Sequence, residues 1–173
     1  MIFLDIWLKI SPINMTEELS YVLINNDEQR YIEVPVNKAT RVFFQREFGH
    51  KNEFVRARMD NLLGSCLLMV TEKPLYRKVL LRKRSRECKL KVILPQEVMF
   101  GKVTAERALA VGKMLDAMYR HQFFCFVKGA VATGCSENFA VIRFLELYRI
   151  NEDVWALDTA KKAWRDYKGR GAP

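Results

Sequence analysis

The side chains best suited to chemistry are His121, Cys125 and Cys135. His121 and Cys125 are one helical turn apart and Cys135 follows ten residues later, so the three offer ligands of the kinds that bind Zn²⁺. A closed tetrahedral site needs a fourth ligand, and the sequence offers none at a suitable spacing. Cys125 also lies inside the aromatic run FFCFV, where a free thiol serves as a small core residue. We therefore predict no metal site and no bound cofactor.

Sequence signatures of catalysis are also missing. The chain contains no GxxxxGK[ST] phosphate loop and no GxGxxG, GxSxG or HExxH motif. A catalytic pair of Cys125 and His121 would need a cleft and an orienting carboxylate, which the spacing does not reveal. Dispersed acidic residues can assemble a metal-dependent nuclease site without strict local spacing, so this alternative stays open. We expect a protein without catalytic residues.

The charge of the chain is its first informative feature. It has 29 Lys and Arg against 20 Asp and Glu, a formal net charge of +9. Residues 74–94 hold eight of these basic residues against Glu87 alone. Such a segment suits a surface that binds phosphates and releases counterions, but it also suits a solvated strand that blunts a sheet edge. The residues of this segment that we predict to contact DNA are Arg82, Arg84, Arg86, Lys89 and Lys91.

The composition indicates a globular protein. With 50% hydrophobic and 12% aromatic residues in 173, the chain can bury a core. Its four cysteines form no CxxC pair, which indicates a reducing cytoplasm. Asp5 interrupts the apolar opening, which therefore predicts a buried strand and no signal peptide. No uncharged apolar run reaches the roughly 20 residues that span a bilayer, so we expect a cytoplasmic protein without a membrane partner.

The first half of the chain predicts strands mixed with helices. Residues 1–10 and 31–36, and less clearly 20–25, are typical of strands. A helix over 38–48 is predicted to begin after Asn37 and to end at a left-handed Gly49. Apolar residues at helical spacing predict a second amphipathic helix before Pro74. These residues are Val55, Met59, Leu62, Cys66 and Met69.

A basic hairpin is predicted to follow. Cys88, Leu90, Val92 and Leu94 alternate with Lys89 and Lys91, so one face of this strand is apolar and the other basic. Together with residues 76–84 it predicts a hairpin that turns near Ser85. Pro95 and Gly101 then mark a boundary between a mixed region, 1–98, and a helical region, 99–173, unless the two form one continuous domain.

The second half predicts three helices. Thr104 is suited to begin a long helix that reaches into FFCFV, and Ser136 to begin the next one. The last helix begins at or just before Asp158. Their apolar stripes are Ala108, Val111, Leu115 and Met118, then Val141, Leu145 and Tyr148, then Ala160, Trp164 and Tyr167.

The last helix combines an apolar face with a basic stripe. Trp164 lies on the predicted buried face, and Lys161, Arg165 and Lys168 have the same spacing one residue on. A helix, a short turn and a basic helix form the layout of a helix-turn-helix unit, whose second helix enters the DNA major groove. The acidic turn at Glu152 and Asp153 would have to face away from DNA or serve as caps. The predicted DNA contacts of this helix are Lys161, Lys162, Arg165 and Lys168.

Residues 140–168 resemble the C-terminal part of small, mostly uncharacterised proteins encoded by phages and mobile elements. The pattern F-L-x-x-Y-x-I-x-E-D before a basic helix carries the resemblance, through Phe144, Leu145, Tyr148, Ile150, Glu152 and Asp153. It covers about 30 of the 173 residues and implies a DNA-associated protein of a mobile element, without supplying catalytic residues.

These observations predict a predominantly helical α+β protein. We expect N-terminal strands and helices, a basic β-hairpin, and a C-terminal three-helix region of the helix-turn-helix kind. The predicted function is non-catalytic binding of double-stranded DNA, regulatory or architectural. The alternative is an assembly protein whose C-terminal helices contact a protein partner or a second copy of the chain.

Overall fold

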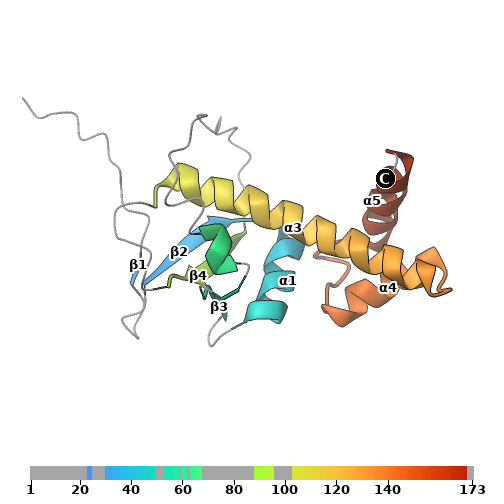
Figure 1. The fold of residues 1–173 in the computed structure, drawn as a ribbon, viewed down its shortest axis with the longest axis horizontal. Coiled ribbons are helices and arrows are strands. Elements are labelled where there is room, and N and C mark those ends of the chain that lie inside the picture. Colours follow the sequence, from blue (N-terminus) through green and yellow to red (C-terminus); the bar gives the residue numbers. More distant parts are fainter. Residues whose placement is uncertain are drawn as a thin grey trace, which may run out of the picture.

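In the computed structural model, one long helix joins a small sheet at one end to two shorter helices at the other (Figure 1). The structure describes residues 23–24, 30–49, 53–58, 60–61, 63–67, 88–95 and 103–170. The predicted class, α+β with mostly helix, is confirmed for these residues. The elements are β1 (Leu23–Ile24), β2 (Arg30–Pro35), α1 (Lys38–Phe48), β3 (Phe54–Arg56), β4 (Lys89–Ile93), α3 (Ala105–Ala132), α4 (Glu137–Leu147) and α5 (Leu157–Gly169).

The four strands form one sheet in the order β1-β2-β4-β3. β2 runs antiparallel to β4, with Ile32 opposite Val92 and Val34 opposite Leu90. All four side chains are fully buried, because alternate residues of each strand point to the same apolar face. The strands predicted over 31–36 and 88–94 are confirmed, and β1 lies within the predicted 20–25. The strand predicted over 1–10 lies outside the described residues.

The partners of β4 differ from the hairpin that the sequence predicts. Lys91–Ile93 pairs with β2 on one edge and, in parallel, with β3 on the other. Both edges of this part of β4 are therefore occupied, and it cannot also pair with residues 76–84. The other arm and its turn, with Arg82, Arg84 and Arg86, lie outside the described residues.

The amphipathic helix predicted from Val55 onward is wrong in its first part. Val55 lies in β3, opposite Val92, and is fully buried in the sheet. Among the described residues that follow, 63–67 are helical, and the Asn61 side chain just before them accepts hydrogen bonds from the backbone N–H groups of Gly64 (2.9 Å) and Arg58 (3.1 Å). Apolar spacing alone cannot show that a buried valine belongs to a neighbouring strand. Met59, Leu62 and Met69 lie outside the described residues.

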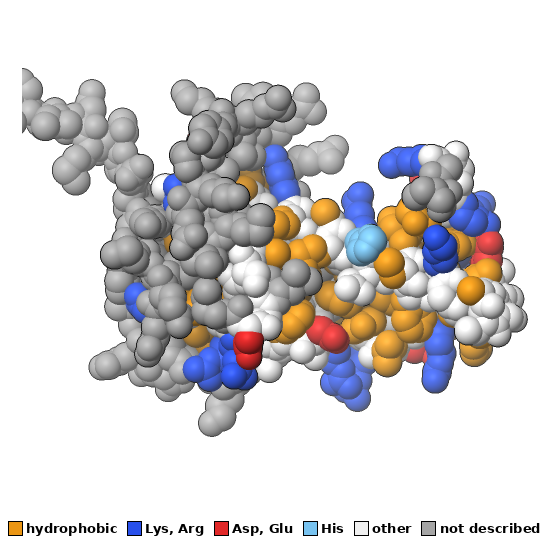
Figure 2. Space-filling view, viewed as in Figure 1, with side chains coloured by type: hydrophobic (Ala, Val, Ile, Leu, Met, Phe, Trp, Pro, Cys, Tyr) orange, Lys and Arg blue, Asp and Glu red, His pale blue; other side chains and the backbone are white. Residues whose placement is uncertain are grey.

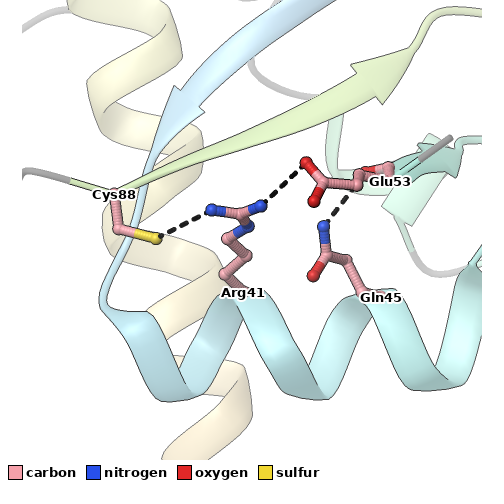
Figure 3. Close-up of polar contacts among 4 residues, drawn as sticks. All are labelled: Arg41, Gln45, Glu53 and Cys88. Carbon is pink, nitrogen blue, oxygen red and sulfur yellow. Dashed lines mark hydrogen bonds and ion pairs between the residues drawn. The ribbon is translucent and has the colours of Figure 1, made fainter. Parts of the chain in front are cut away.

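Helix α1 is attached to the sheet by polar contacts (Figure 3). The Arg41 guanidinium donates to the carboxylate of Glu53 (2.9 Å), and Gln45 donates to the backbone carbonyl of Glu53 (3.1 Å). Another guanidinium nitrogen of Arg41 lies 3.8 Å from the Cys88 Sγ at the start of β4. The helix begins after Asn37 as predicted, but Gly49 is extended (φ −60°), so the predicted left-handed ending is wrong.

Helix α3 spans 28 residues and crosses the sheet closely. Its predicted beginning is confirmed, since the Thr104 hydroxyl accepts a hydrogen bond from the Arg107 N–H (3.3 Å). A Cβ placed on Gly112 would lie 2.1 Å from the carbonyl oxygen of Pro35, so this helical position accepts only glycine at the observed packing distance. One core runs from the sheet residues to Phe144 and Trp164, across the boundary near Pro95.

The last two helices begin as predicted. The Ser136 hydroxyl accepts a hydrogen bond from the Phe139 N–H at the start of α4, and the Glu152 carboxylate accepts one from the Leu157 N–H at the start of α5 (3.3 and 3.1 Å). Glu152 therefore serves as a cap. Ala160 and Trp164 are buried, and Tyr167 is half-buried. Within the described residues, no helix has the length and hydropathy needed to cross a membrane.

Candidate nucleic-acid interface

The basic residues of α5 lie on two flanks of the helix. Trp164 faces the core, so positions one residue further along the helix face α4 and positions two residues further face α1 and α3. We call the first set the α4 flank and the second the groove flank. The α4 flank consists of Lys161, Arg165 and Lys168, and the groove flank of Lys162, Asp166 and Arg170.

The α4 flank is balanced by acidic side chains. Lys161 and Arg165 line a hollow of about 470 Å³ together with Glu137 and Asp158. Lys168 forms an ion pair with Glu137 and lies over the Trp164 ring, 5.9 Å from its centroid. The hydrogen bond from Lys168 lowers the pKa of the Glu137 carboxyl below its ordinary 4.5, which keeps the pair charged. The predicted basic stripe is therefore present, but part of its charge is neutralised.

The groove flank opens onto a larger hollow between α1, α3 and α5. A groove of about 570 Å³ adjoins a second of about 520 Å³, and both are lined by Arg120, Phe124 and Arg170. We call the two together the cationic groove. Its five basic side chains are exposed and come from three helices and the residue that ends α5: Lys38, Lys113, Arg120, Lys162 and Arg170. In Figure 2, Lys and Arg side chains surround hydrophobic ones at the end of the molecule where α5 stands beside α3.

None of these five basic side chains forms an ion pair with an acidic group of the described residues. Two acidic residues line the same groove, Asp116 and Asp166. Cations therefore outnumber acids there by five to two. An excess of exposed positive charge around a hollow concentrates field lines and attracts anions.

Asp116 on α3 forms hydrogen bonds that hold the start of α1 in place. Its Oδ1 accepts hydrogen bonds from the Asn37 N–H (3.1 Å) and from the Thr40 hydroxyl (2.7 Å), and both Asp116 and Thr40 are buried. Asn37 itself makes no side-chain cap, so a carboxylate from α3 replaces the local cap at this helix end. This contact fixes Lys38 at the edge of the groove.

Aromatic side chains line the apolar part of the groove. Phe124 and Tyr167 lie nearly parallel, with ring centroids 4.2 Å apart, and Trp155 and Tyr119 are in contact at 5.5 Å. Phe124, Trp155 and Tyr167 are half-buried. Tyr119 is buried, its hydroxyl makes no hydrogen bond within the described part of the chain, and burial raises the pKa of its phenol. The groove therefore combines a neutral aromatic wall with a cationic rim.

The basic strand residues lie away from this groove. β4 and α5 are at opposite ends of the molecule in Figure 1. Lys89 forms an ion pair with Glu33, and Lys91 lies over the Phe54 ring, 5.5 Å from its centroid. The structure thus brings Lys161, Arg165 and Lys168 together, but it places Lys162 on the other flank and Lys89 and Lys91 at the sheet.

Sequence reasoning missed four of the five groove cations: Lys38, Lys113, Arg120 and Arg170. Lys38 is on α1, Lys113 and Arg120 are on α3, and Arg170 directly follows α5, so no single local cluster marks the set. One signal was present, since Lys113 and Arg120 are seven residues apart and share a face of α3. Arg170 continues the spacing of Lys162 and Asp166 by one turn.

Cys125 and His121 are not in the core. Cys125 is exposed, so the prediction that it packs inside the aromatic run is wrong: α3 turns this position outward while Phe123 and Val127 are buried. Its Sγ lies 3.4 Å from the Nε2 of His121. Among the residues that the structure describes, no cluster of three or more His, Cys, Asp and Glu side chains is arranged to hold a metal ion.

Comparisons of the chain with protein-family models, with curated proteins and with solved structures found no match. We therefore infer the function of the chain from the geometry and charge of its surface.

Proposed function

We propose that this chain is a non-catalytic DNA-binding protein, regulatory or architectural, that holds DNA phosphates in the cationic groove. The observation that supports this most directly is that five basic side chains, none paired with an acid of the described residues, line two adjoining hollows that share Arg120 and Arg170. When a basic side chain contacts a phosphate, the counterions bound to the DNA backbone are released, and this release favours binding. A basic side chain that is already paired with an acid contributes less, because its ion pair must be given up first.

The groove suits phosphate binding through its composition as well as its charge. Arg120 and Arg170 line both hollows, and a guanidinium can donate two parallel hydrogen bonds to one phosphate. Lys38 lies in the first turn of α1, directly after Asn37, and adds its own charge to the rim of the groove. These features favour an anion that extends along the groove from α1 to α5.

The proposal uses α5 differently from a helix-turn-helix recognition helix. Nine residues, 148–156, connect α4 to α5, whereas the helix-turn-helix motif uses a turn of about three or four. The exposed face of α5 also carries two acidic residues, Asp158 before its first basic residue and Asp166 between Arg165 and Lys168. We therefore assign the main contacts to the groove flank. Cytoplasmic location, supported by the four cysteines without a CxxC pair, and origin in a mobile element, supported by the sequence pattern of residues 140–168, are part of the same proposal.

Two double variants on the same helix test the proposal. Lys162→Ala with Arg170→Ala removes charge from the groove, and Lys161→Ala with Arg165→Ala removes the same charge from the α4 flank. We expect the first to weaken binding of a labelled DNA about tenfold and to reduce the slope of log affinity against log salt by about two. The second should change affinity less than about twofold. Fluorescence anisotropy at several salt concentrations measures both.

The opposite ranking of the two variants would favour the α4 flank as the contact element, as the basic stripe in the sequence predicts. Wild-type protein that fails to bind DNA at low salt would contradict DNA binding altogether. Thermal melts serve as the control, since exposed charges contribute little to stability and all variants should unfold near the wild-type temperature.

A second candidate function is assembly through α4. Phe139 and Leu147, about two turns apart on this helix, are each 54% exposed, more than any other large hydrophobic side chain of the described residues. Two exposed large apolar side chains on one helix are candidates for a contact with a second copy of the chain. If α4 joins two copies, light scattering should give a dimer that persists at high salt, and Phe139→Ser with Leu147→Ser should give a monomer. A wild-type monomer at all concentrations contradicts this function.

A further inference from the structure

We infer that the cationic groove takes an unpaired strand, with its bases against the aromatic wall and its phosphates along the cationic rim. The inference depends on the proposed function and narrows its ligand from DNA in general to single-stranded DNA. It differs from the expectation of double-stranded DNA that the sequence alone supports.

The shape of the groove is the first argument. Four of its five cations line a hollow of about 570 Å³ that is formed by residues of α1, α3, α5 and the loop before α5. A DNA duplex is a convex cylinder with its phosphates on the outside, so it would touch the rim of such a hollow without filling it. The volume lies within the range of about 300–1,000 Å³ that is typical of pockets for small organic ligands, and a nucleotide is of that size.

The chemistry of the wall is the second argument. Phe124, Trp155 and Tyr167 line the groove and keep part of their surface exposed. A duplex keeps its bases stacked inside, so these rings would have no base to contact. A single strand presents base faces and phosphates together, and aromatic side chains beside a cationic track are how proteins bind it without regard to sequence.

The exposure of the aromatic side chains is the third argument. Burial makes an aromatic ring unavailable to bases, and this holds for Phe144 and Trp164, which are buried. It does not hold for Trp155, which lies in the loop before α5, or for Phe124 and Tyr167, which are half-buried at the groove.

Competition between strands tests the inference. The probe is a labelled oligothymidylate of about ten nucleotides, a length within the site sizes of single-strand binders. It is compared with a duplex of equal length and with an abasic strand of equal charge. We expect the full-length protein to bind the oligothymidylate about tenfold more tightly than either competitor, because stacking of one or two bases accounts for such a factor.

Tryptophan fluorescence locates the site. Binding of the oligothymidylate should quench the emission, and Trp155→Phe should remove most of the quench while the protein still binds. Arg120→Ala should weaken binding of this strand about tenfold. Lys128→Ala is the matched control, since Lys128 is exposed on the same helix but does not line the groove, and it should bind within twofold of wild type.

The outcomes separate the inference from the proposed function. Duplex bound as tightly as the single strand, or an abasic strand bound as tightly as the oligothymidylate, overturns the inference and leaves DNA binding standing. No binding of any strand at low salt overturns both. Quenching that survives unchanged in Trp155→Phe places the bases elsewhere and also overturns the inference.

Discussion

The two flanks of α5 carry similar basic residues but differ in charge balance. On the α4 flank, Lys161, Arg165 and Lys168 meet Glu137 and Asp158. On the groove flank, Lys162 and Arg170 join basic residues of α1 and α3, and only Asp116 and Asp166 oppose five cations. The same helix therefore presents one nearly neutral side and one cationic side. What a basic residue can bind depends on the element that lies opposite it.

The ends of the neighbouring helices explain the difference. Helix α4 has Glu137 in its first turn, where an acidic residue is favourable to the helix dipole, and this carboxylate then pairs with Lys168. Helix α1 has no acidic residue in its first turn. Its carboxylate comes from Asp116 of α3 and is buried against Asn37 and Thr40. The N-terminus of α1 is thus capped by a buried carboxylate, and Lys38 beside it forms no ion pair with an acidic group of the described residues.

The largest expected effect is on the free energy of unfolding and comes from Trp164, because both flanks of α5 depend on this side chain. Trp164 is buried and positions α5 between α4 and α3. Trp164→Ala should leave a cavity and lower the free energy of unfolding by about 3–5 kcal/mol. Denaturant unfolding measures this change. Arg165→Ala, one residue along, should change it by less than about 0.5 kcal/mol. Equal stabilities of the two variants would mean that α5 faces the core with a different side.

A smaller effect is expected on the affinity for DNA when an acidic side chain of the groove is neutralised. Asp166 is an exposed acid of the groove flank between Lys162 and Arg170. Asp166→Asn should raise the affinity for DNA about threefold at low salt, because it removes repulsion of the phosphates, and the gain should fade as salt rises. Asp158→Asn is the matched change on the α4 side. An equal gain from Asp158→Asn would show that the two flanks do not differ in function.

The smallest expected effect is on the pH dependence of stability and comes from Glu137. Its pKa is lowered by Lys168, so the ion pair stabilises the folded state above the ordinary pKa of 4.5, and this contribution is lost as pH falls through the lowered pKa. We expect Glu137→Gln to be slightly less stable than wild type at pH 7 and equally stable in strong acid. Thermal melts across this pH range give the comparison. A constant difference at all pH values would assign the loss to packing.

Much of the helical half could be predicted because its signals are local. Thr104 and Ser136 begin α3 and α4, and the apolar spacing around Trp164 identifies the buried face of α5. The basic stripe beside that face was also correctly located. Its partner Glu137 was not, since 31 positions separate it from Lys168 and no periodic pattern connects them.

The sequence was enough to determine where α1, α3, α4 and α5 begin, the apolar faces of α4 and α5, and the alternation of β2 and β4, because each of these depends on neighbours within a few residues. The tertiary structure alone decided that Val55 belongs to a strand beside β4, that Asp116 caps α1 across 79 positions, and that Lys38, Arg120 and Arg170 surround one groove. The physical reason is that sheet partners, buried carboxylates and charge clusters form between segments distant in the chain. Such contacts depend on how the whole core packs, whereas a local sequence pattern shows only which side of each helix or strand faces the core.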